Sequence, residues 1–302
     1  MKILLLGATG QVGFELQRSL TPLGRVIPAC REGRLPGGGA ARVANLSDLT
    51  ALRALLNAEK PDVIVNAAAY TAVDRAEAEP ELAHAINATA PEVLAQWCHV
   101  HGSRLIHYST DYVFDGRGQR PWREQDGAAP LSVYGRSKRD GEVAIAASGA
   151  EYLILRTAWV YAARGSNFLR TMLRLGAERE HLRVVNDQIG APTPARWIAA
   201  ATATLLTQVQ AGRPWHTGIA HLSAAGQTSW HGFAQEIFAL AHAANLLERV
   251  PTLDAIASSD YPTAAQRPAF SCLDNTRLHT WFGFSLPDWR EGVAQVMGEL
   301  AP

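Results

Sequence analysis

The sequence predicts an α/β fold built on a doubly wound parallel sheet, with a smaller domain towards the C-terminus. Short apolar segments alternate with longer amphipathic segments as far as about residue 160, which is the pattern of strand and helix units in a parallel sheet. The first apolar segment, residues 2–6, runs directly into the glycine-rich stretch 7–13. A strand, a glycine turn and a helix in this order open many doubly wound folds.

The composition is that of a globular protein and argues against several classes of function. The 302 residues are 47% apolar and 19% charged, and Lys plus Arg equals Asp plus Glu at 28 each. The chain therefore lacks the basic excess that favours nucleic acid. No apolar run has the length of a membrane span. The apolar run before Gly7 is too short for a signal peptide. We expect a cytoplasmic protein with no nucleic-acid partner and no membrane partner.

The cysteines and histidines show no metal-binding pattern. Cys30, Cys98 and Cys272 are far apart and odd in number, so neither a disulfide framework nor a metal knuckle is predicted, and reduced, mostly buried thiols are expected. The histidine pairs at positions 99 and 101 and at 216 and 221 lack the spacing of metal ligands. We expect these histidines to lie at the surface or to be hydrogen-bonded.

The first strand and helix enclose a loop that carries Gly7, Gly10 and Gly13. Glycine permits a tight turn and lets backbone N–H groups meet a pyrophosphate at the start of a helix. The loop lies between a buried strand and a helix, which favours dinucleotide binding over the alternative of a plain tight turn. Its spacing, G-x-x-G-x-x-G, differs from the commoner G-x-G-x-x-G.

The second strand, near residues 25–29, bears on the choice of cofactor. A site for NAD usually has Asp or Glu at the end of this strand to hold the ribose 2′-hydroxyl. Here the chain continues with Cys30 and Arg31, and a guanidinium suits a 2′-phosphate. We predict NADPH in preference to NADH; the alternative is that Arg31 is a solvated loop residue. Asn45 and Leu46 close the third strand, where the adenine lies in such folds.

The middle of the chain continues the alternation. An amphipathic helix is predicted for 48–59, and the strand 61–69 then ends in small residues. Small side chains let the backbone approach a flat cofactor, although they are also compatible with the start of a helix. The loop 70–74 follows at the carboxyl end of the strand, where ligands bind in open α/β sheets. Helices are predicted for 77–88 and 91–101.

A threonine, a tyrosine and a lysine form the candidate catalytic group. Strand 104–108 leads to Thr110, whose hydroxyl can hydrogen-bond a ketone oxygen; the alternative is that Thr110 is only a good strand former. Tyr134 and Lys138 are four residues apart and therefore share one helix face. An ammonium lowers the pKa of a nearby phenol, so we expect Tyr134 to exchange a proton near neutral pH. A solvated helix face is the alternative for this pair.

The later elements are less informative about chemistry. Helices are predicted for 167–178, 197–209, 230–243 and 289–300, and a strand for 182–185. We assign residues 1–155, with later returns near 200–227 and 272–289, to a Rossmann-type dinucleotide-binding domain. Most of 156–302 is assigned to a substrate-binding domain, with the ligand cleft between the two.

Seven short motifs stand out along the chain. They are Gly7-Ala8-Thr9-Gly10-Gln11-Val12-Gly13-Phe14-Glu15-Leu16, Asn66-Ala67-Ala68-Ala69-Tyr70-Thr71-Ala72-Val73-Asp74, Ser109-Thr110-Asp111-Tyr112-Val113-Phe114-Asp115-Gly116, Tyr134-Gly135-Arg136-Ser137-Lys138, Trp159-Val160-Tyr161, Asn186-Asp187-Gln188-Ile189-Gly190-Ala191-Pro192-Thr193 and Arg267-Pro268. Together they resemble the dTDP-4-dehydrorhamnose reductase family of extended short-chain dehydrogenases/reductases, over residue 1 to about 300. The glycine loop and the Tyr-Lys pair indicate only the superfamily, whereas the runs 109–116 and 186–193 are much more specific.

The resemblance implies an activity and a set of roles. The activity is reduction of the C4 ketone of dTDP-4-dehydro-L-rhamnose to dTDP-L-rhamnose with NAD(P)H, the last step in making this sugar nucleotide for cell-surface polysaccharide. Tyr134 is implied as the proton donor, Lys138 as the residue that holds the nicotinamide ribose, and Thr110 as the residue that tunes the tyrosine. The further residues implied to contact the cofactor are Gly10, Gln11, Val12, Ala69, Tyr70 and Thr71, and those implied on the sugar side are Thr110, Asp111, Tyr112, Trp159, the 224–228 segment and the Arg267 region.

The chain departs from the family at one place. Some members bind Mg²⁺ at a dimer interface through three glutamates. Glu15 matches the first of these positions and Glu299 the last, but the middle one is Arg196. A cation among carboxylates replaces a ligand and repels a metal. We predict no Mg²⁺ there and an ion pair from Arg196 to Glu15 or Glu299; the alternative is three unrelated surface charges.

Two other functions are weighed against the reductase. A related nucleotide-sugar epimerase or dehydratase is one, but dehydratases carry acidic residues beside the hydroxyl, and here Asp111 is a single acid next to Thr110. The other is a non-catalytic, NADP-binding regulatory subunit of the same fold, which could retain all three catalytic residues. The sequence is compatible with a homodimer and does not fix which sugar nucleotide is used.

Overall fold

A seven-stranded parallel sheet forms the centre of the computed structural model, which describes residues 1–301. All six pairings between neighbouring strands are parallel. The order β11-β6-β5-β4-β1-β2-β3 turns back at β1, from which the chain winds first to one side and then to the other. The predicted Rossmann-type sheet is therefore confirmed. Its strands are β1 (Lys2–Leu6), β2 (Arg25–Cys30), β3 (Arg42–Val43), β4 (Val63–Asn66), β5 (Arg104–Thr110), β6 (Glu151–Thr157) and β11 (Gly218–His221).

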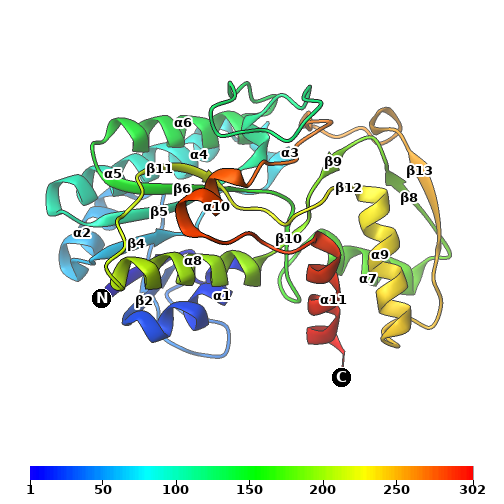
Figure 1. Cartoon of the computed structure of the whole chain (residues 1–302), viewed down its shortest axis with the longest axis horizontal. Helices are drawn as coiled ribbons and strands as arrows, with labels where there is room; N and C mark the ends of the chain where they lie inside the picture. The colour runs from blue at the N-terminus through cyan, green and yellow to red at the C-terminus, as the bar shows by residue number, and fades with distance from the viewer. Residues whose placement is uncertain (302) are drawn as a thin grey trace.

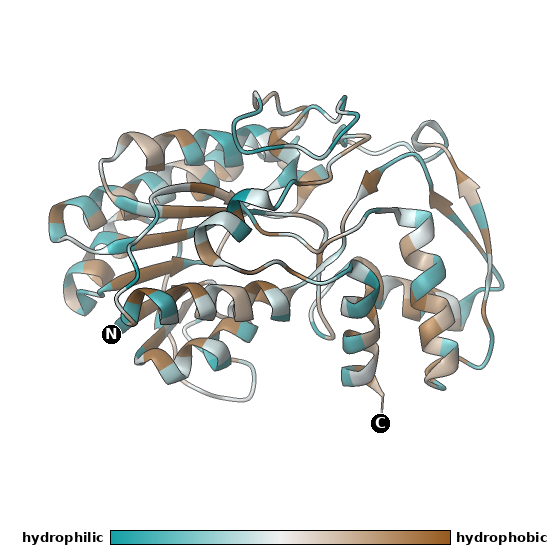
Figure 2. Ribbon diagram, viewed as in Figure 1, coloured by the Kyte–Doolittle hydropathy of each residue, from teal (hydrophilic) through white to brown (hydrophobic). Residues whose placement is uncertain are grey.

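Helices cover both faces of this sheet, as its sequence requires. The four residues of β4 are all buried, and the central strands are among the most apolar parts of the chain (Figure 2), as expected for a sheet buried on both sides. One apolar core joins the sheet to α1 (Gln11–Leu20) and α8 (Ala195–Gln210). The other joins it to α2 (Leu49–Glu59), α5 (Ala90–His101) and α6 (Val133–Ala147).

The segment between β4 and α5 differs from the prediction. The helix expected over 77–88 is confirmed only from Pro80 onwards, because the chain forms α3 (Val73–Ala76), then α4 (Pro80–His84), then a π-helical turn over Ala85–Thr89. Proline lacks an N–H and is accommodated at a first helical turn, so Pro80 begins a new helix rather than continuing α3. The π-helical turn carries Asn87 inward, where it is 1% exposed.

A separate core lies to one side of the sheet and is built from later parts of the chain (Figure 1). It packs α7 (Phe168–Glu178), α9 (Trp230–Ala243) and α11 (Trp289–Leu300) against one another. The parallel pair β8 (His181–Val185) and β13 (Thr252–Ile256) covers its outer side. The remaining elements are β7 (Val160–Tyr161), β9 (Ile189–Gly190), β10 (Thr193–Pro194), β12 (Thr228–Ser229), α10 (Thr276–Phe282) and the 3₁₀ turns Thr21–Leu23, Asp111–Val113 and Ser258–Asp260.

Later segments return to the central sheet. β11 pairs with β6 at the edge, and α8 packs across the sheet beside α1. α10 packs on β11. The segments that make these contacts lie within or next to 200–227 and 272–289, where the chain was expected to return to the first domain. The division into two domains stays a prediction. Within residues 1–301, no helix is long and apolar enough to cross a membrane.

Candidate active site

The candidate site lies at the carboxyl end of the sheet, where the winding reverses. Leu6 of β1 pairs with Asn66 of β4, and Asn66 pairs with His107 of β5. The segments that follow these three strands therefore leave the sheet side by side. In open α/β sheets this reversal point is where ligands bind.

The glycine loop after β1 is shaped by close backbone contacts. Gly7 has φ +76°, and a Cβ there would lie 2.6 Å from the nitrogen of Ala68. A Cβ on Gly13 would lie 2.0 Å from the carbonyl oxygen of Gly7. Gly10 caps α1 without a side-chain hydrogen bond, so the first N–H groups of the helix have no side-chain partner. Such a helix start favours an anion, and the loop has the form that a pyrophosphate requires.

The predicted cofactor segment Ala69 to Thr71 is fixed in place by Asn87. The Asn87 amide accepts a hydrogen bond from the Tyr70 nitrogen (2.8 Å) and donates one to the Tyr70 carbonyl (3.0 Å). It also donates to the Ser137 hydroxyl at 3.0 Å, which ties the segment to α6. Asn87 falls inside the helix predicted for 77–88, and no role was predicted for it. An asparagine inside a predicted helix, where it is a poor former, was the available signal.

The other predicted cofactor residues lie at the rim. Arg31 follows β2 with a side chain that is 77% exposed and 3.7 Å from Glu32. Asn45 is exposed and its side chain accepts hydrogen bonds within its own turn, from Ser47. The Leu46 side chain is buried in the core, so its backbone is the part available to a ligand. Gln11 accepts a hydrogen bond from Asn167 at 2.8 Å, which joins the glycine loop to the start of α7.

Helix α6 presents Tyr134 in its first turn and Lys138 one turn later. Ser132 caps the helix by accepting a hydrogen bond from the Gly135 nitrogen at 3.1 Å. A Cβ on Gly135 would lie 2.3 Å from the carbonyl oxygen of Tyr112, so glycine lets α6 pack directly on the segment after β5. The rings of Tyr134 and Tyr112 meet edge to face at 5.7 Å. The helix start thus places the phenol beside Thr110, Asp111 and Tyr112.

The pKa of Tyr134 is raised, whereas its spacing from Lys138 predicted that it would be lowered. Burial raises the pKa of Tyr134 to about 12, against a lowering effect of the Thr110 hydroxyl. The Lys138 amine instead donates a hydrogen bond to the carbonyl of Tyr108 at 2.6 Å and lies 3.1 Å from Nε2 of His107. Burial lowers the pKa of Lys138 to about 8. Tyr134 is therefore protonated at neutral pH, as a proton donor must be.

Thr110 and Asp111 form a buried polar pair at the end of β5. The Thr110 hydroxyl donates to Oδ1 of Asp111 at 3.0 Å and accepts from the Tyr112 nitrogen at 3.2 Å. Both residues are at most 5% exposed. Burial raises the pKa of Asp111 to about 6. The strand end thus supplies a hydroxyl that is oriented by a carboxylate and lies next to the phenol of Tyr134.

An ion pair joins α3 to the C-terminal region. Two guanidinium nitrogens of Arg267 donate to the two carboxylate oxygens of Asp74, at 3.0 and 2.7 Å. The Arg267 hydrogen bonds hold the pKa of Asp74 below its usual value. Hydrogen bonding to Tyr112 and Asp74 raises the pKa of Arg267, against the effect of burial. Arg267 therefore lies at the site, next to a predicted substrate residue.

Trp159 is held in an unusual conformation just after β6, where the chain passes from the sheet to the core of α7, α9 and α11. Its φ of +46° falls in the left-handed region, which is uncommon for a tryptophan. Its ring stacks on Trp230 with centroids 3.5 Å apart and planes 2° apart. A Cβ on Gly190 would lie 2.4 Å from this ring, so glycine makes room for it. Strain of this kind often accompanies a functional position.

Glu15, Arg196 and Glu299, the positions compared above with the Mg²⁺ ligands of some family members, lie near one another. Arg196 donates to Glu299 at 2.5 Å, which confirms the predicted ion pair. Burial and the nearby Glu299 raise the pKa of Glu15, while Arg196 acts in the opposite direction. Arg196 therefore offsets part of the negative charge of the two carboxylates that remain.

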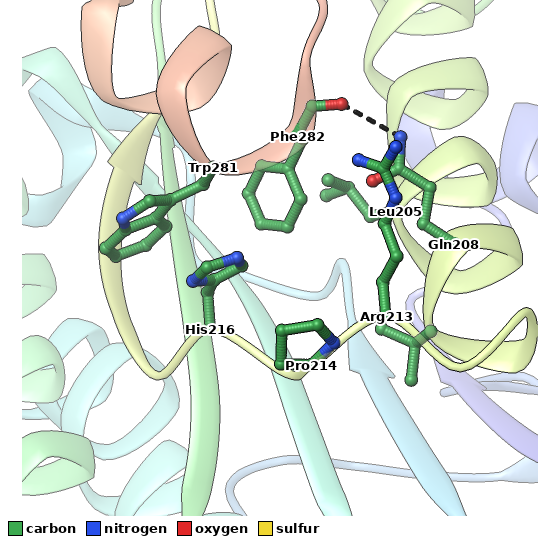
Figure 3. A pocket seen from close by; sticks show the side chains of 8 residues that line it. Leu205, Gln208, Arg213, Pro214, His216, Trp281 and Phe282 are labelled. Carbon is green, nitrogen blue, oxygen red and sulfur yellow. Dashed lines mark hydrogen bonds between the residues drawn. The ribbon is translucent and has the colours of Figure 1, made fainter.

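A cavity of about 220 Å³ lies away from this site. It is at the amino end of β11, beside the loop that precedes that strand, whereas the candidate site is at the carboxyl ends of the strands. His216 stacks on Trp281 at its edge, with ring centroids 5.1 Å apart. Figure 3 shows Gln208 donating to the Phe282 carbonyl across it. Histidines 216 and 221 form one of the two pairs expected at the surface or hydrogen-bonded. His216 packs at this cavity, and His221, in β11, is 0% exposed.

A glycine loop at a helix start and a Tyr-Lys pair at the strand ends define a nucleotide-dependent oxidoreductase of the short-chain dehydrogenase/reductase type. The family model described as the RmlD substrate binding domain matches residues 1–301. The chain belongs to this family, which confirms the resemblance to the dTDP-4-dehydrorhamnose reductases.

Similar proteins support that assignment over the full length of the chain. A dTDP-4-dehydrorhamnose reductase from Burkholderia thailandensis is 47% identical, with 99% of each chain covered. One from Shigella flexneri is 46% identical, over 99% of this chain and 98% of that one. The crystal structure of the Clostridium acetobutylicum reductase superposes with a TM-score of 0.89 at 34% identity, covering 99% of both chains. That from Bacillus anthracis, solved in complex with NADP, gives 0.87 at 32% identity, covering 99% of this chain and 100% of that one.

Proposed function

We propose that this protein reduces the C4 ketone of dTDP-4-dehydro-L-rhamnose to dTDP-L-rhamnose with a reduced nicotinamide cofactor. The observation that carries the proposal is the position of Tyr134. Its phenol lies at the carboxyl end of the sheet, beside the Thr110–Asp111 pair and one helical turn from Lys138. The relatives named above support the choice of substrate.

The residues at the strand ends fit a dinucleotide. Gly7, Gly10 and Gly13 leave the start of α1 open to a pyrophosphate, because side chains there would collide with backbone or crowd it. Gln11 and Val12 follow in the first turn of α1. Ala69 to Thr71 lie across the reversal point, where hydrogen bonds from Asn87 to the Tyr70 backbone hold them in place. When bound, the cofactor supplies the hydride that reduces the ketone carbon. The bound NADP in the Bacillus anthracis reductase supports this assignment.

Tyr134 supplies the proton of the reaction. The pKa of Tyr134, raised to about 12, keeps the phenol protonated in the neutral range. It passes that proton to the ketone oxygen as the carbonyl becomes a hydroxyl, and the phenolate later regains a proton from solvent. The Thr110 hydroxyl stabilises the phenolate when its O–H turns from Asp111 to the phenol oxygen, and the positive charge that Lys138 can carry adds to this, as oriented polar groups do in a buried site. A positioned general acid typically contributes about 10²–10⁴-fold to the rate.

The sugar is held by groups on both sides of the reversal point. Asp111 and Tyr112 come from the end of β5, and Arg267 is brought to them by its pair with Asp74. Trp159 offers an aromatic face from the junction of the two cores. Two of these groups belong to the C-terminal half of the chain. We therefore assign substrate recognition to both halves and hydride and proton transfer to the first.

The cofactor preference follows from Arg31. No acidic residue occupies the end of β2, and Arg31 extends into solvent at that point, where a 2′-phosphate would lie. We expect kcat/KM to be higher for NADPH than for NADH, and Arg31→Ala to reduce the difference. A marked preference of the wild-type protein for NADH would contradict this assignment.

The decisive experiment measures NADPH oxidation with dTDP-4-dehydro-L-rhamnose, against a panel of other nucleotide keto-sugars. The reductase proposal requires turnover with the first substrate and formation of dTDP-L-rhamnose. Isomerisation of a nucleotide sugar, or its dehydration, without net cofactor oxidation would identify an epimerase or a dehydratase. Cofactor binding without turnover of any sugar would identify a regulatory subunit.

A further inference from the structure

A buried chain of hydrogen bonds runs from the backbone of the cofactor segment to Lys138. The Ala68 nitrogen donates to Oδ1 of Asn66 at 3.2 Å. The amide nitrogen of Asn66 lies 3.0 Å from Nδ1 of His107, and Nε2 of His107 lies 3.1 Å from Nζ of Lys138. Lys138 donates onward to the Tyr108 carbonyl at 2.6 Å. All three side chains are at most 1% exposed, so water does not compete for these contacts.

The direction of this chain is fixed at its first link. The Ala68 N–H can only donate, so the oxygen of the Asn66 amide must face it. The amide nitrogen of Asn66 then faces His107 and donates, which makes Nδ1 of His107 an acceptor. Burial and the nearby Lys138 lower the pKa of His107 well below its usual value. A neutral imidazole has one N–H, and with Nδ1 accepting, that proton is on Nε2.

His107 therefore points an N–H group at the amine of Lys138. A charged ammonium can only donate and would oppose this N–H, whereas a neutral amine has a lone pair that accepts it. We propose that His107 is a positioning residue that disfavours the charged form of Lys138, through a tautomer set by Asn66. The charged form of Lys138 becomes more favourable when the amine leaves this contact or when the tautomer reverses.

Burial also disfavours the charged form of Lys138, but no other polar group around the amine does so within residues 1–301. Glu142, on the same helix, favours the charged amine, but its carboxylate is held in a two-pronged pair by Arg156 at 2.7 and 2.8 Å. Tyr134 and Tyr108, the remaining ionisable neighbours, are both neutral in the neutral range because burial raises their pKa values. Asp111, beyond Tyr134, is bonded to Thr110. The imidazole is thus the one contact of Nζ that disfavours its charge among the described residues.

Asn66→Asp tests the proposal by an isosteric change. The carboxylate accepts from Ala68 and also from Nδ1, so the imidazole proton moves to Nδ1 and Nε2 becomes an acceptor for a charged Lys138. ¹⁵N spectra of histidine-labelled protein report the tautomer, with His107→Gln used to assign the signal. Only three lysines are present in the sequence, so the Lys138 titration can be followed in lysine-labelled protein, with Lys138→Arg used to assign it.

The expected result is an Nε2–H tautomer in the wild-type protein and an Nδ1–H tautomer in Asn66→Asp. The pKa of Lys138 should rise in Asn66→Asp by at least about one unit, the scale of a favourable hydrogen bond or charge near a buried group. Asn57→Asp is the matched control: it makes the same change in charge at an exposed position, where its oxygen still accepts from Trp97, and it should leave Lys138 unmoved.

Two results would overturn the proposal. One is an Nδ1–H tautomer in the wild-type protein, and the other is a rise in the Lys138 pKa without a change of tautomer, which would show a through-space effect of charge alone. If Asn66→Asp does not fold, His107→Gln decides. Its amide can turn its oxygen to the amine, so the Lys138 pKa should again rise, and an unchanged value would contradict us.

The kinetic consequence rests on the proposed function. The limb of the kcat/KM profile that reports Lys138 should move to higher pH in Asn66→Asp, by the amount seen in the spectra. The spectra themselves need no turnover. A failed reductase assay with the expected spectra would therefore remove the proposed function alone, whereas normal turnover with an unmoved tautomer would remove this inference alone.

Discussion

The two sides of the candidate site are built in different ways. On the nucleotide side the shape comes from the backbone, with Gly7 and Gly13 in contacts that exclude any side chain. On the sugar side it comes from side chains that meet from distant parts of the sequence, such as Asp74 with Arg267 and Trp159 with Trp230. Backbone contacts cannot relax around an added atom, whereas a side-chain pair can be weakened one bond at a time. We therefore expect larger losses of binding from substitutions on the nucleotide side than from substitutions on the sugar side.

The largest effect should come from a single oxygen at the junction of the two sides. Tyr134→Phe removes the proton donor and leaves the ring against Tyr112, so kcat should fall by at least about 10² with the fold intact. Steady-state kinetics and circular dichroism measure the two quantities. Tyr152→Phe, near the amino end of β6, is the control and should keep wild-type turnover. Near wild-type kcat in Tyr134→Phe would take the proton step away from this residue.

Gly13→Ala should have the next largest effect and tests the nucleotide side directly. Its Cβ would lie 2.0 Å from the Gly7 carbonyl, so the loop must shift. Overpacking of this kind costs about 1–3 kcal/mol, and the displaced N–H groups should weaken NADPH binding by about tenfold or more. Denaturant unfolding and cofactor titration give both values. Gly127→Ala, which meets nothing within 4 Å, should change neither; equal behaviour of the two variants would break the comparison.

The difference between the two sides also explains what the sequence could predict. The glycine loop and the Tyr134–Lys138 pair are local patterns, and so are α9 and α11, which span the residues predicted for them. Their meaning depends on spacing along the chain. The central strands could be predicted for the same reason, because a run of buried apolar residues is visible in the sequence itself.

What the sequence could not predict depends on pairing between segments far apart. His107 contacts Lys138 across 31 positions, and nothing in the apolar strand around it distinguishes it from a core histidine. The depressed pKa expected for Tyr134 was wrong because helical spacing does not say where the Lys138 amine points. The π-helical turn at Asn87 was missed because tertiary packing against Tyr70 and Ser137 overrides the local helix pattern.

Asp74→Asn should have a moderate effect that is confined to the sugar side. It replaces one charged partner of Arg267 in a half-buried pair, where charge-assisted hydrogen bonds are worth about 1.5–3 kcal/mol. We expect KM for the sugar nucleotide to rise by about tenfold, with a smaller change in kcat and unchanged affinity for NADPH. Arg174→Gln removes a pair of similar chemistry on the exposed face of α7 and should alter none of these. Weaker NADPH binding in Asp74→Asn would place the pair on the nucleotide side instead.

The smallest effect should come from the surface cluster of Glu15, Arg196 and Glu299. The Arg196–Glu299 pair is partly exposed, with side chains 34% and 27% accessible, and such pairs are worth at most about 1 kcal/mol. Arg196→Gln should therefore lower the unfolding free energy only slightly. Because Arg196 replaces one carboxylate ligand and offsets part of the charge of the other two, addition of Mg²⁺ or EDTA should leave Tm, oligomeric state and kcat of the wild-type protein unchanged. Arg196→Glu would place three carboxylates together, which a hard divalent cation prefers, and Tm of this variant alone should rise with Mg²⁺. A wild-type dimer that forms only with Mg²⁺ would show that the arginine does not replace the metal.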